Sequence, residues 1–147
     1  MITLGYLVST VLGLVFGSFA GAQVWRLRAR QLIQDKKDGE ECDKAELKRL
    51  KPLVSSKTTH DRSRCLECHH TLAWYDLLPL VSWLSTQGKC RYCKAPIGRF
   101  EPLMELGTAT LFVTFYHYWV TTTGVNDFWP GLLLWIAILV LFVILFA

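Results

Sequence analysis

Hydrophobic residues are concentrated at the two ends of the chain, and polar residues fill its middle. Residues 2–25 contain no charged side chain, and this length suffices for a helix to cross a hydrocarbon core about 30 Å thick. Two further apolar stretches, 106–122 and 128–147, are separated by a short polar turn. The pattern predicts a membrane all-α fold with three transmembrane helices, of which the last two form a hairpin.

A cleavable signal peptide is the alternative interpretation of the first stretch, because residues 20–22 resemble a small-residue cleavage site. The apolar run is too long for a signal peptide and Arg26 follows it directly, so a transmembrane helix is favoured. Within this helix Gly13, Gly17 and Gly21 recur every four residues and share one face. The stripe predicts close packing against another helix, although glycine is also simply common in membrane helices.

The distribution of charge predicts the orientation. The chain is 52% hydrophobic with a net charge of +4, and all 16 of its Lys and Arg residues lie between Arg26 and Arg99. Such residues near the ends of membrane spans are retained on the cytoplasmic side, and the turn at 123–127 has none. We therefore expect the N-terminus outside and a cytosolic loop at 26–104, made of a charged segment (31–62) and a four-cysteine module (63–104).

Two C-x-x-C hooks, separated by 21 residues, lie in this module. They predict a zinc site with four thiolate ligands, because two hooks complete the closed tetrahedral shell that structural zinc prefers. Disulfides and a thioredoxin-type redox pair are alternatives, the first disfavoured by a reducing cytosol and the second by the lack of a βαβ pattern. The expected ligands are Cys65, Cys68, Cys90 and Cys93, whereas Cys42 has no partner in a hook.

The first hook also matches the C-x-x-C-H pattern of covalent haem attachment, since His69 follows Cys68. A cytosolic location and the second hook both argue against haem. His69 and His70 are expected to face solvent or to surround the metal ligands, because four thiolates already fill a zinc shell.

The segment between the hooks, 72–84, is more apolar and aromatic than a solvated linker. It either lies against membrane lipid, where Trp and Tyr are favoured, or forms the small core of the module. Two acids are candidate functional groups, Glu105 at the start of a span and Asp76 in its aromatic setting. The helix dipole alone also explains a glutamate at the position of Glu105. Nucleic-acid binding is not expected, because most basic residues are interleaved with acids.

Taken together, these motifs resemble the type IV prepilin peptidases. The matching pieces are Gly17-Ser18-Phe19 with Arg26-Leu27, the two hooks, 74–79, 82–84, 88–91 and 97–106, in the order of that family. The resemblance implies an enzyme that cuts the leader from prepilin-like membrane peptides at the cytosolic face of the bacterial inner membrane. It also implies methylation of the new N-terminal amine with S-adenosylmethionine. Three positions depart from the family pattern: Gly21, Leu66 and Glu101.

The resemblance covers the amino-terminal portion of the family, which is associated with methylation. The two catalytic aspartates belong to the later half, so we expect no peptidase residue in this chain and a dependence on the missing carboxy-terminal half. One alternative is a non-enzymatic membrane adapter that uses its zinc module to recruit a cytosolic partner. Another is an independent methyltransferase, for which the sequence offers no glycine-rich loop to bind the donor.

Overall fold

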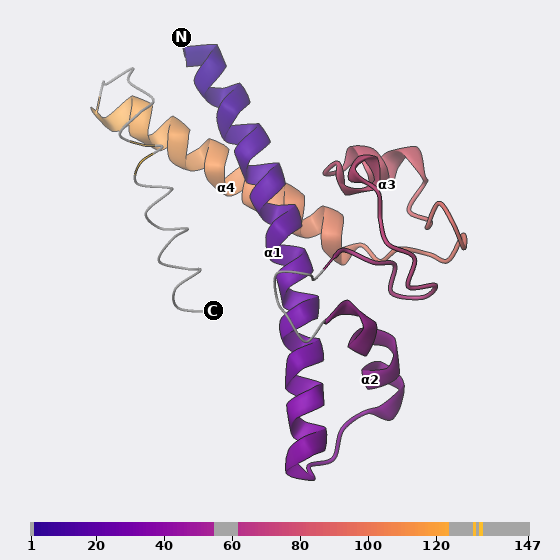
Figure 1. Ribbon diagram of the computed structural model, residues 1–147. Helices are drawn as coiled ribbons and strands as arrows, with labels where there is room; N and C mark the ends of the chain where they lie inside the picture. The colour runs from indigo at the N-terminus through magenta and orange to yellow at the C-terminus, as the bar shows by residue number, and fades with distance from the viewer. Residues whose placement is uncertain (1, 55–61, 124–130, 132, 134–147) are drawn as a thin grey trace.

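The computed structural model of the protein describes residues 2–54, 62–123, 131 and 133. Over these residues the chain is mostly helical, as predicted. Two long helices, α1 (Ile2–Asp38) and α4 (Phe100–Thr123), carry most of the structure (Figure 1). Between them, the described residues form four short helical elements: α2 (Lys44–Leu50), η1 (Lys51–Leu53), η3 (Trp74–Leu77) and α3 (Val81–Ser85).

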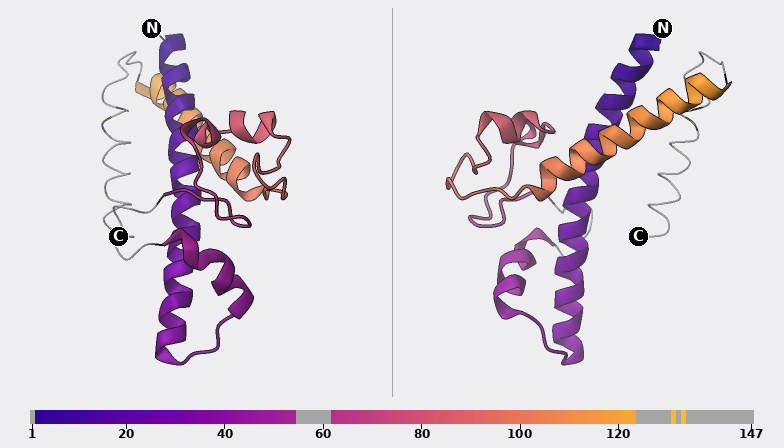
Figure 2. Two further views of the ribbon diagram at one scale, coloured as in Figure 1. Left: turned by 45° about the vertical axis from the view of Figure 1, so that its right-hand side comes forward. Right: turned by 180° about the vertical axis from the view of Figure 1, so that it is seen from behind.

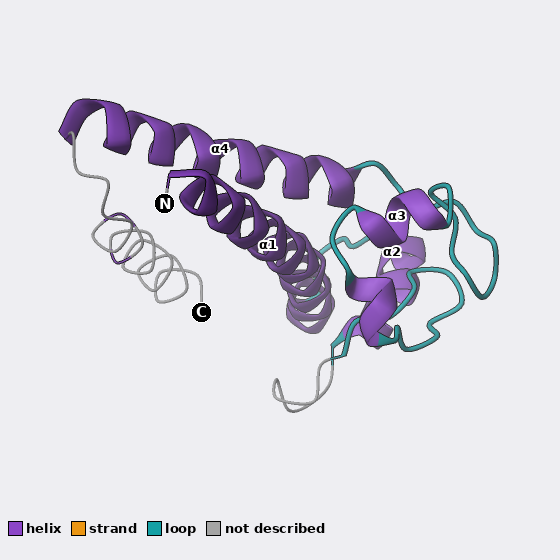
Figure 3. Ribbon diagram, turned by 90° about the horizontal axis from the view of Figure 1, so that it is seen from above, coloured by secondary structure: helices purple, strands orange, loops and turns teal. Residues whose placement is uncertain are grey.

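The main contact of the molecule joins α1 to α4, which run antiparallel and cross obliquely. Near the N-terminus of α1, Tyr6 and Tyr116 form an edge-to-face pair with ring centroids 5.0 Å apart. At the other end of the contact, Trp25 packs against Phe100 with ring centroids 5.6 Å apart. Figure 3 shows the two helices side by side from above. The chain leaves α1 at its polar end, at Asp38, whereas the cysteine module joins α4 at Phe100, beside Trp25 of α1.

Small residues form the α1 side of this contact. A methyl group on Gly13 would collide with the backbone of Ala109, and one on Gly17 would lie 2.6 Å from Cα of Glu105. The absence of a side chain at these positions is what lets the two backbones approach. The predicted stripe is confirmed and extends toward the N-terminus; its buried residues are Gly5, Ser9, Gly13, Gly17 and Gly21.

The polar end of α1 has a small core of its own, which it shares with α2 and η1 (Figure 2). Asp43 caps α2 by accepting hydrogen bonds from the backbone N–H of Ala45 at 2.8 Å and of Glu46 at 3.2 Å. Arg28 of α1 pairs with Glu46 at 2.8 Å. The core residues are Ala29, Leu32, Leu47, Leu50 and Leu53. The charged segment therefore contains a short helix, α2, that packs on α1.

Within the described residues, α1 is the one helix whose length and apolar composition suffice to cross a membrane. It contains the predicted span 2–25 and continues to Asp38 as a polar helix. The predicted span 106–122 lies inside α4, where two glutamates and several threonines lower the hydropathy. The third predicted span, 128–147, lies outside the described residues apart from Gly131 and Leu133. The number of three spans therefore stays a prediction.

Candidate metal centre

The two cysteine hooks have the same backbone geometry. In each, the N–H of the first cysteine donates to the carbonyl five residues later, at 3.0 Å from Cys65 and 2.8 Å from Cys90. The residue after the second cysteine has a positive φ, 57° at His69 and 61° at Lys94. This tight turn directs backbone amides at the first sulfur, as the N–H of Glu67 shows at 3.5 Å from Sγ of Cys65.

The hooks bring together the four predicted ligands Cys65, Cys68, Cys90 and Cys93. Their sulfur atoms all lie within 4.8 Å of one another, and those of Cys65 and Cys93 are 3.9 Å apart. Metal–sulfur bonds of about 2.3 Å in a tetrahedron place the sulfur atoms roughly 3.8 Å apart. A slight contraction of the cluster is enough to reach this geometry. All four cysteines have free thiols, so the disulfide alternative is not formed.

Backbone amides and neighbouring thiols determine the charge of the metal-free cluster. Burial raises the pKa of the Cys90 thiol, but the backbone N–H groups of Cys93 and Tyr92 outweigh burial and lower this pKa to about 7. Burial raises the pKa of the Cys65 thiol to about 12. Cys90 is therefore the first thiol of the two to ionise, and a metal ion must displace protons from its neighbours.

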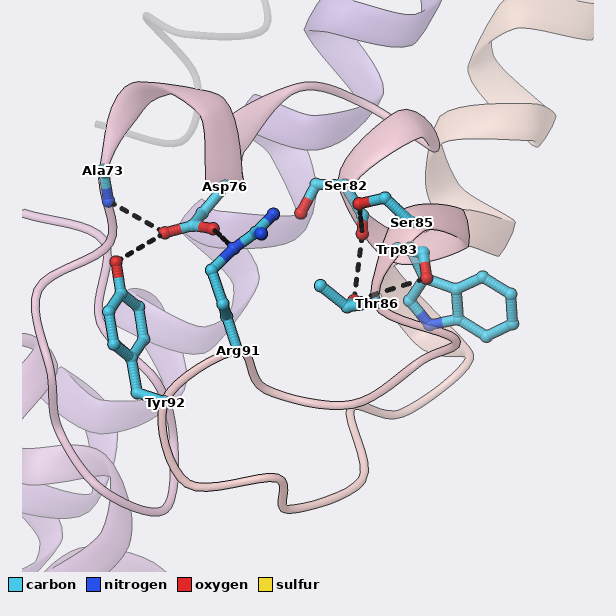
Figure 4. A network of polar contacts seen from close by, with 8 residues as sticks. All are labelled: Ala73, Asp76, Ser82, Trp83, Ser85, Thr86, Arg91 and Tyr92. Carbon is cyan, nitrogen blue, oxygen red and sulfur yellow. Dashed lines mark hydrogen bonds and ion pairs between the residues drawn. The ribbon is translucent and has the colours of Figure 1, made fainter.

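Asp76 joins the segment between the hooks to the second hook (Figure 4). Its carboxylate accepts hydrogen bonds from Nε of Arg91 at 2.9 Å, the hydroxyl of Tyr92 at 3.0 Å and the backbone N–H of Ala73 at 3.2 Å. The side chain is only 6% exposed. Burial alone would raise the pKa of Asp76, but Arg91 and Tyr92 lower it. The ionised carboxylate thus connects the segment between the hooks to the second hook.

Glu105 joins the same segment to α4. Its Oε2 accepts a hydrogen bond of 2.7 Å from the backbone N–H of Leu80, directly before α3. Glu105 is 6% exposed. One turn earlier, Oε1 of Glu101 accepts a hydrogen bond of 3.0 Å from the indole N–H of Trp25, while its Oε2 is buried without a partner. The two glutamates therefore connect α4 to the module and to α1.

A cavity of about 530 Å³ lies between α1, α4 and the cysteine module. Its lining is mostly apolar and includes Phe19 and Trp25 of α1. Glu101 and Glu105 line it from α4, and basic side chains such as Lys89 line it from the module. The cavity can therefore hold a ligand that has an apolar part and also carries a positive and a negative charge.

Comparison with known proteins adds to this geometry. Residues 11–119 match the model of the bacterial peptidase A24 N-terminal domain. The chain belongs to this family. The match includes both cysteine hooks, most of α1 and most of α4. The resemblance noted from the motifs is therefore confirmed for the A24 N-terminal domain, and no solved structure matches the chain significantly.

Several relatives of this A24 domain are named as prepilin-processing enzymes. The type 4 prepilin-like proteins leader peptide-processing enzyme of Escherichia coli is 37% identical over 110 residues, which are 72% of this chain and 37% of the relative. The prepilin leader peptidase/N-methyltransferase of Pseudomonas aeruginosa is 36% identical, over 71% of this chain and 36% of the relative. That of Vibrio cholerae is 29% identical, over 81% and 40%. The chain spans less than half the length of these relatives.

The other predicted residues of the A24 domain have distinct places. Cys42 lies against the small core of α1 and α2, away from the four-cysteine cluster. His70 packs its ring on Tyr92 of the second hook, with ring centroids 3.7 Å apart. It therefore lies beside the four-cysteine cluster and is not one of its members. Asp76 and Glu105 both act as hydrogen-bond acceptors that hold the module, and a further role for them stays a prediction.

Glu101 is the residue that sequence reasoning missed. It was noted as a departure from the family pattern, not as a polar group of the site. Its spacing from Glu105 is the signal that was available, because residues four apart on a helix share a face. The contact with Trp25 was not predictable, since it joins residues far apart in the chain.

Proposed function

We propose that this chain is the amino-terminal part of a prepilin leader peptidase/N-methyltransferase. It would hold prepilin-like membrane peptides at the cytosolic face of the bacterial inner membrane while they are cut and methylated. The observation that carries this proposal is the family match over residues 11–119, together with relatives that are named for this activity. The match favours this function over a non-enzymatic adapter.

The proposed topology has three transmembrane helices, with the N-terminus outside and the cysteine module in the cytosol. The antiparallel contact of α1 and α4 supports it, because two consecutive spans cross a membrane in opposite directions. The confinement of Lys and Arg to 26–99 supports the orientation. An impermeant thiol reagent applied to intact cells should therefore leave Cys42 unlabelled. Ready labelling of Cys42 from outside would show that the orientation is opposite to the proposed one.

Zinc is the proposed occupant of the four-cysteine cluster. Thiolates at 2.3 Å from a tetrahedral ion suit zinc, and four protein ligands leave no open position for water. The proposed role is structural: Cys65 and Cys68 would be joined to Cys90 and Cys93, which fixes the segment between the hooks. No step of catalysis is assigned to the metal.

The cavity is the proposed place of methylation. S-adenosylmethionine, the proposed donor, would supply the methyl group to the N-terminal amine of the cut substrate. In this proposal Glu101, which lines the cavity and whose Oε2 has no hydrogen-bond partner, would accept a hydrogen bond from this amine. Phe19 and Trp25 would cover the apolar part of a ligand. This chain contributes binding and orientation of the amine in this proposal.

Cutting the leader is not assigned to this chain alone. Hydrolysis by an aspartic peptidase needs two carboxylates that share a proton and a water. Asp76 is fully engaged by Arg91, Tyr92 and Ala73, and the exposed Asp38 is held by Gln34 at 3.1 Å. The peptidase step would depend on the carboxy-terminal half.

Two assays with the purified chain in detergent test this function. With a prepilin alone, no cut at the leader junction is expected; a specific cut, lost in Asp76→Asn, would refute the assignment. With the carboxy-terminal half of a relative supplied as a second polypeptide, both the cut and transfer of a labelled methyl group are expected. Glu101→Gln should then lower methylation and spare the cut, whereas the exposed Glu40→Gln should affect neither.

A further inference from the structure

The segment between the hooks presents an apolar face that no other described element covers. No residue of η3 or α3 is buried as a whole, so the prediction that this segment forms the core of the module is not supported. Trp74 is 74% exposed and Leu84 is 65% exposed. The exposed large apolar residues of this face are Trp74, Tyr75, Val81 and Leu84, whereas the exposed Leu77 and Leu78 line the cavity. A surface of this kind marks an interaction site.

The fold holds this face beside the apolar part of the long helices. In Figure 1, α3 lies level with the N-terminal half of α1, while α2 lies against its polar end. The Glu105–Leu80 hydrogen bond fixes the height, since Glu105 packs next to the backbone of Gly17. Exposed apolar side chains also lie on α1 and α4, for example those of Val11 and Leu103.

We propose that the face formed by 74–84 inserts into the lipid of the cytosolic leaflet. Its position level with the apolar part of α1, the candidate membrane span, favours lipid over a protein partner. Tyr and Trp at its N-terminal end suit the interface, where a ring is buried while its polar edge stays wet. The module also exposes Lys89, Lys94 and Arg99, which complement anionic headgroups.

The inference requires α1 to cross the membrane and is independent of the proposed methylation. In this arrangement the module contacts the membrane and is not a separate domain surrounded by the cytosol. Trp83 supports this arrangement because its side chain faces the second hook. Its ring packs on Gly88, and its indole N–H donates to the carbonyl of Gly98 at 3.3 Å. The apolar face is thereby turned outward from the second hook.

Photocrosslinking in reconstituted vesicles of phosphatidylethanolamine and phosphatidylglycerol tests the proposal. A benzophenone amino acid is placed at Leu84, and at Lys48 on the exposed side of α2 as the control. Mass spectrometry of the full chain should detect adducts of the Leu84 variant with lipid acyl chains and none for the Lys48 variant. Adducts at position 84 with protein only, or equal lipid adducts at both positions, would overturn the inference.

A second pair of variants shows that the fold positions the face. Glu105→Gln keeps an acceptor for the N–H of Leu80, so lipid adducts at position 84 should persist. Glu105→Ala removes the acceptor, and the adducts should decrease while zinc content stays unchanged. Equal adduct yields in the two variants would contradict the role assigned to Glu105 in holding the face against the membrane.

Discussion

Gly17→Ala tests the α1–α4 contact on which the placement of the site depends. A methyl group at this position would lie 2.6 Å from Cα of Glu105 and 2.7 Å from the carbonyl oxygen of Met104. Both atoms belong to the backbone of α4, so rotation of a side chain cannot relieve the collision. Carbon atoms pack best at about 3.5–4.0 Å, and the helices must therefore separate by roughly 1 Å.

A separation of this size weakens the whole contact. A gap of about 0.5–1 Å removes roughly a quarter to a half of the dispersion attraction between facing atoms. Overpacking of this kind typically costs about 1–3 kcal/mol, and we expect Gly17→Ala to lower the free energy of unfolding by that amount. The measurement is unfolding in mixed micelles titrated with SDS, followed by circular dichroism.

Gly107→Ala is the matched control. Gly107 also lies inside a long helix, but a methyl group there meets no atom within 4 Å. The same substitution should be neutral, or stabilising by about 0.5–1 kcal/mol, because alanine restricts the unfolded chain. If Gly17→Ala unfolds at the same SDS fraction as Gly107→Ala, the close approach of α1 to α4 does not exist.

Three further predictions concern the module. Cys90→Ser should abolish binding of one zinc per chain while Cys42→Ser retains it, as metal analysis of the purified variants will show. Zinc affinity, measured by competition with a chelator, should fall as pH falls and fall more steeply below about pH 7, where Cys90 also takes up a proton. Asp76→Ala should destabilise the module by about 1–3 kcal/mol and speed the loss of zinc to a chelator, because Tyr92 and Ala73 lose a buried acceptor. Asp38→Ala is the control and should change neither quantity. Equal rates of zinc loss in the two variants would contradict the structural role assigned to Asp76.

The parts of the structure that the sequence predicted are those governed by local rules. The spacing of Cys65 from Cys68 and of Cys90 from Cys93 fixes each hook within a few residues, so the four ligands were found. The period of four residues placed Gly17 on the helix contact for the same reason. Family motifs then supplied the class of protein, which residue chemistry alone does not give.

The parts that were missed depend on contacts between distant residues. Hydropathy shows where a helix leaves the membrane and not where it ends, so the extension of α1 to Asp38 was not predicted. Asp76 was chosen for its aromatic surroundings, and its partner Arg91 was not predictable, because the pair forms only after both hooks have folded. The same holds for Trp25, whose indole reaches Glu101 across the fold.

These contacts form one continuous connection from the four-cysteine cluster to the two long helices, α1 and α4. The second hook holds Asp76 through Arg91 and Tyr92, the segment that follows Asp76 reaches Leu80, and Leu80 is bonded to Glu105 beside the α1–α4 contact. A zinc ion that joins the hooks would therefore act at a distance: it would set the height of the apolar face and the wall of the cavity. A zinc ion with no open coordination position would thus serve the structure of the chain, because the module is bonded to Glu105 of α4 at Leu80.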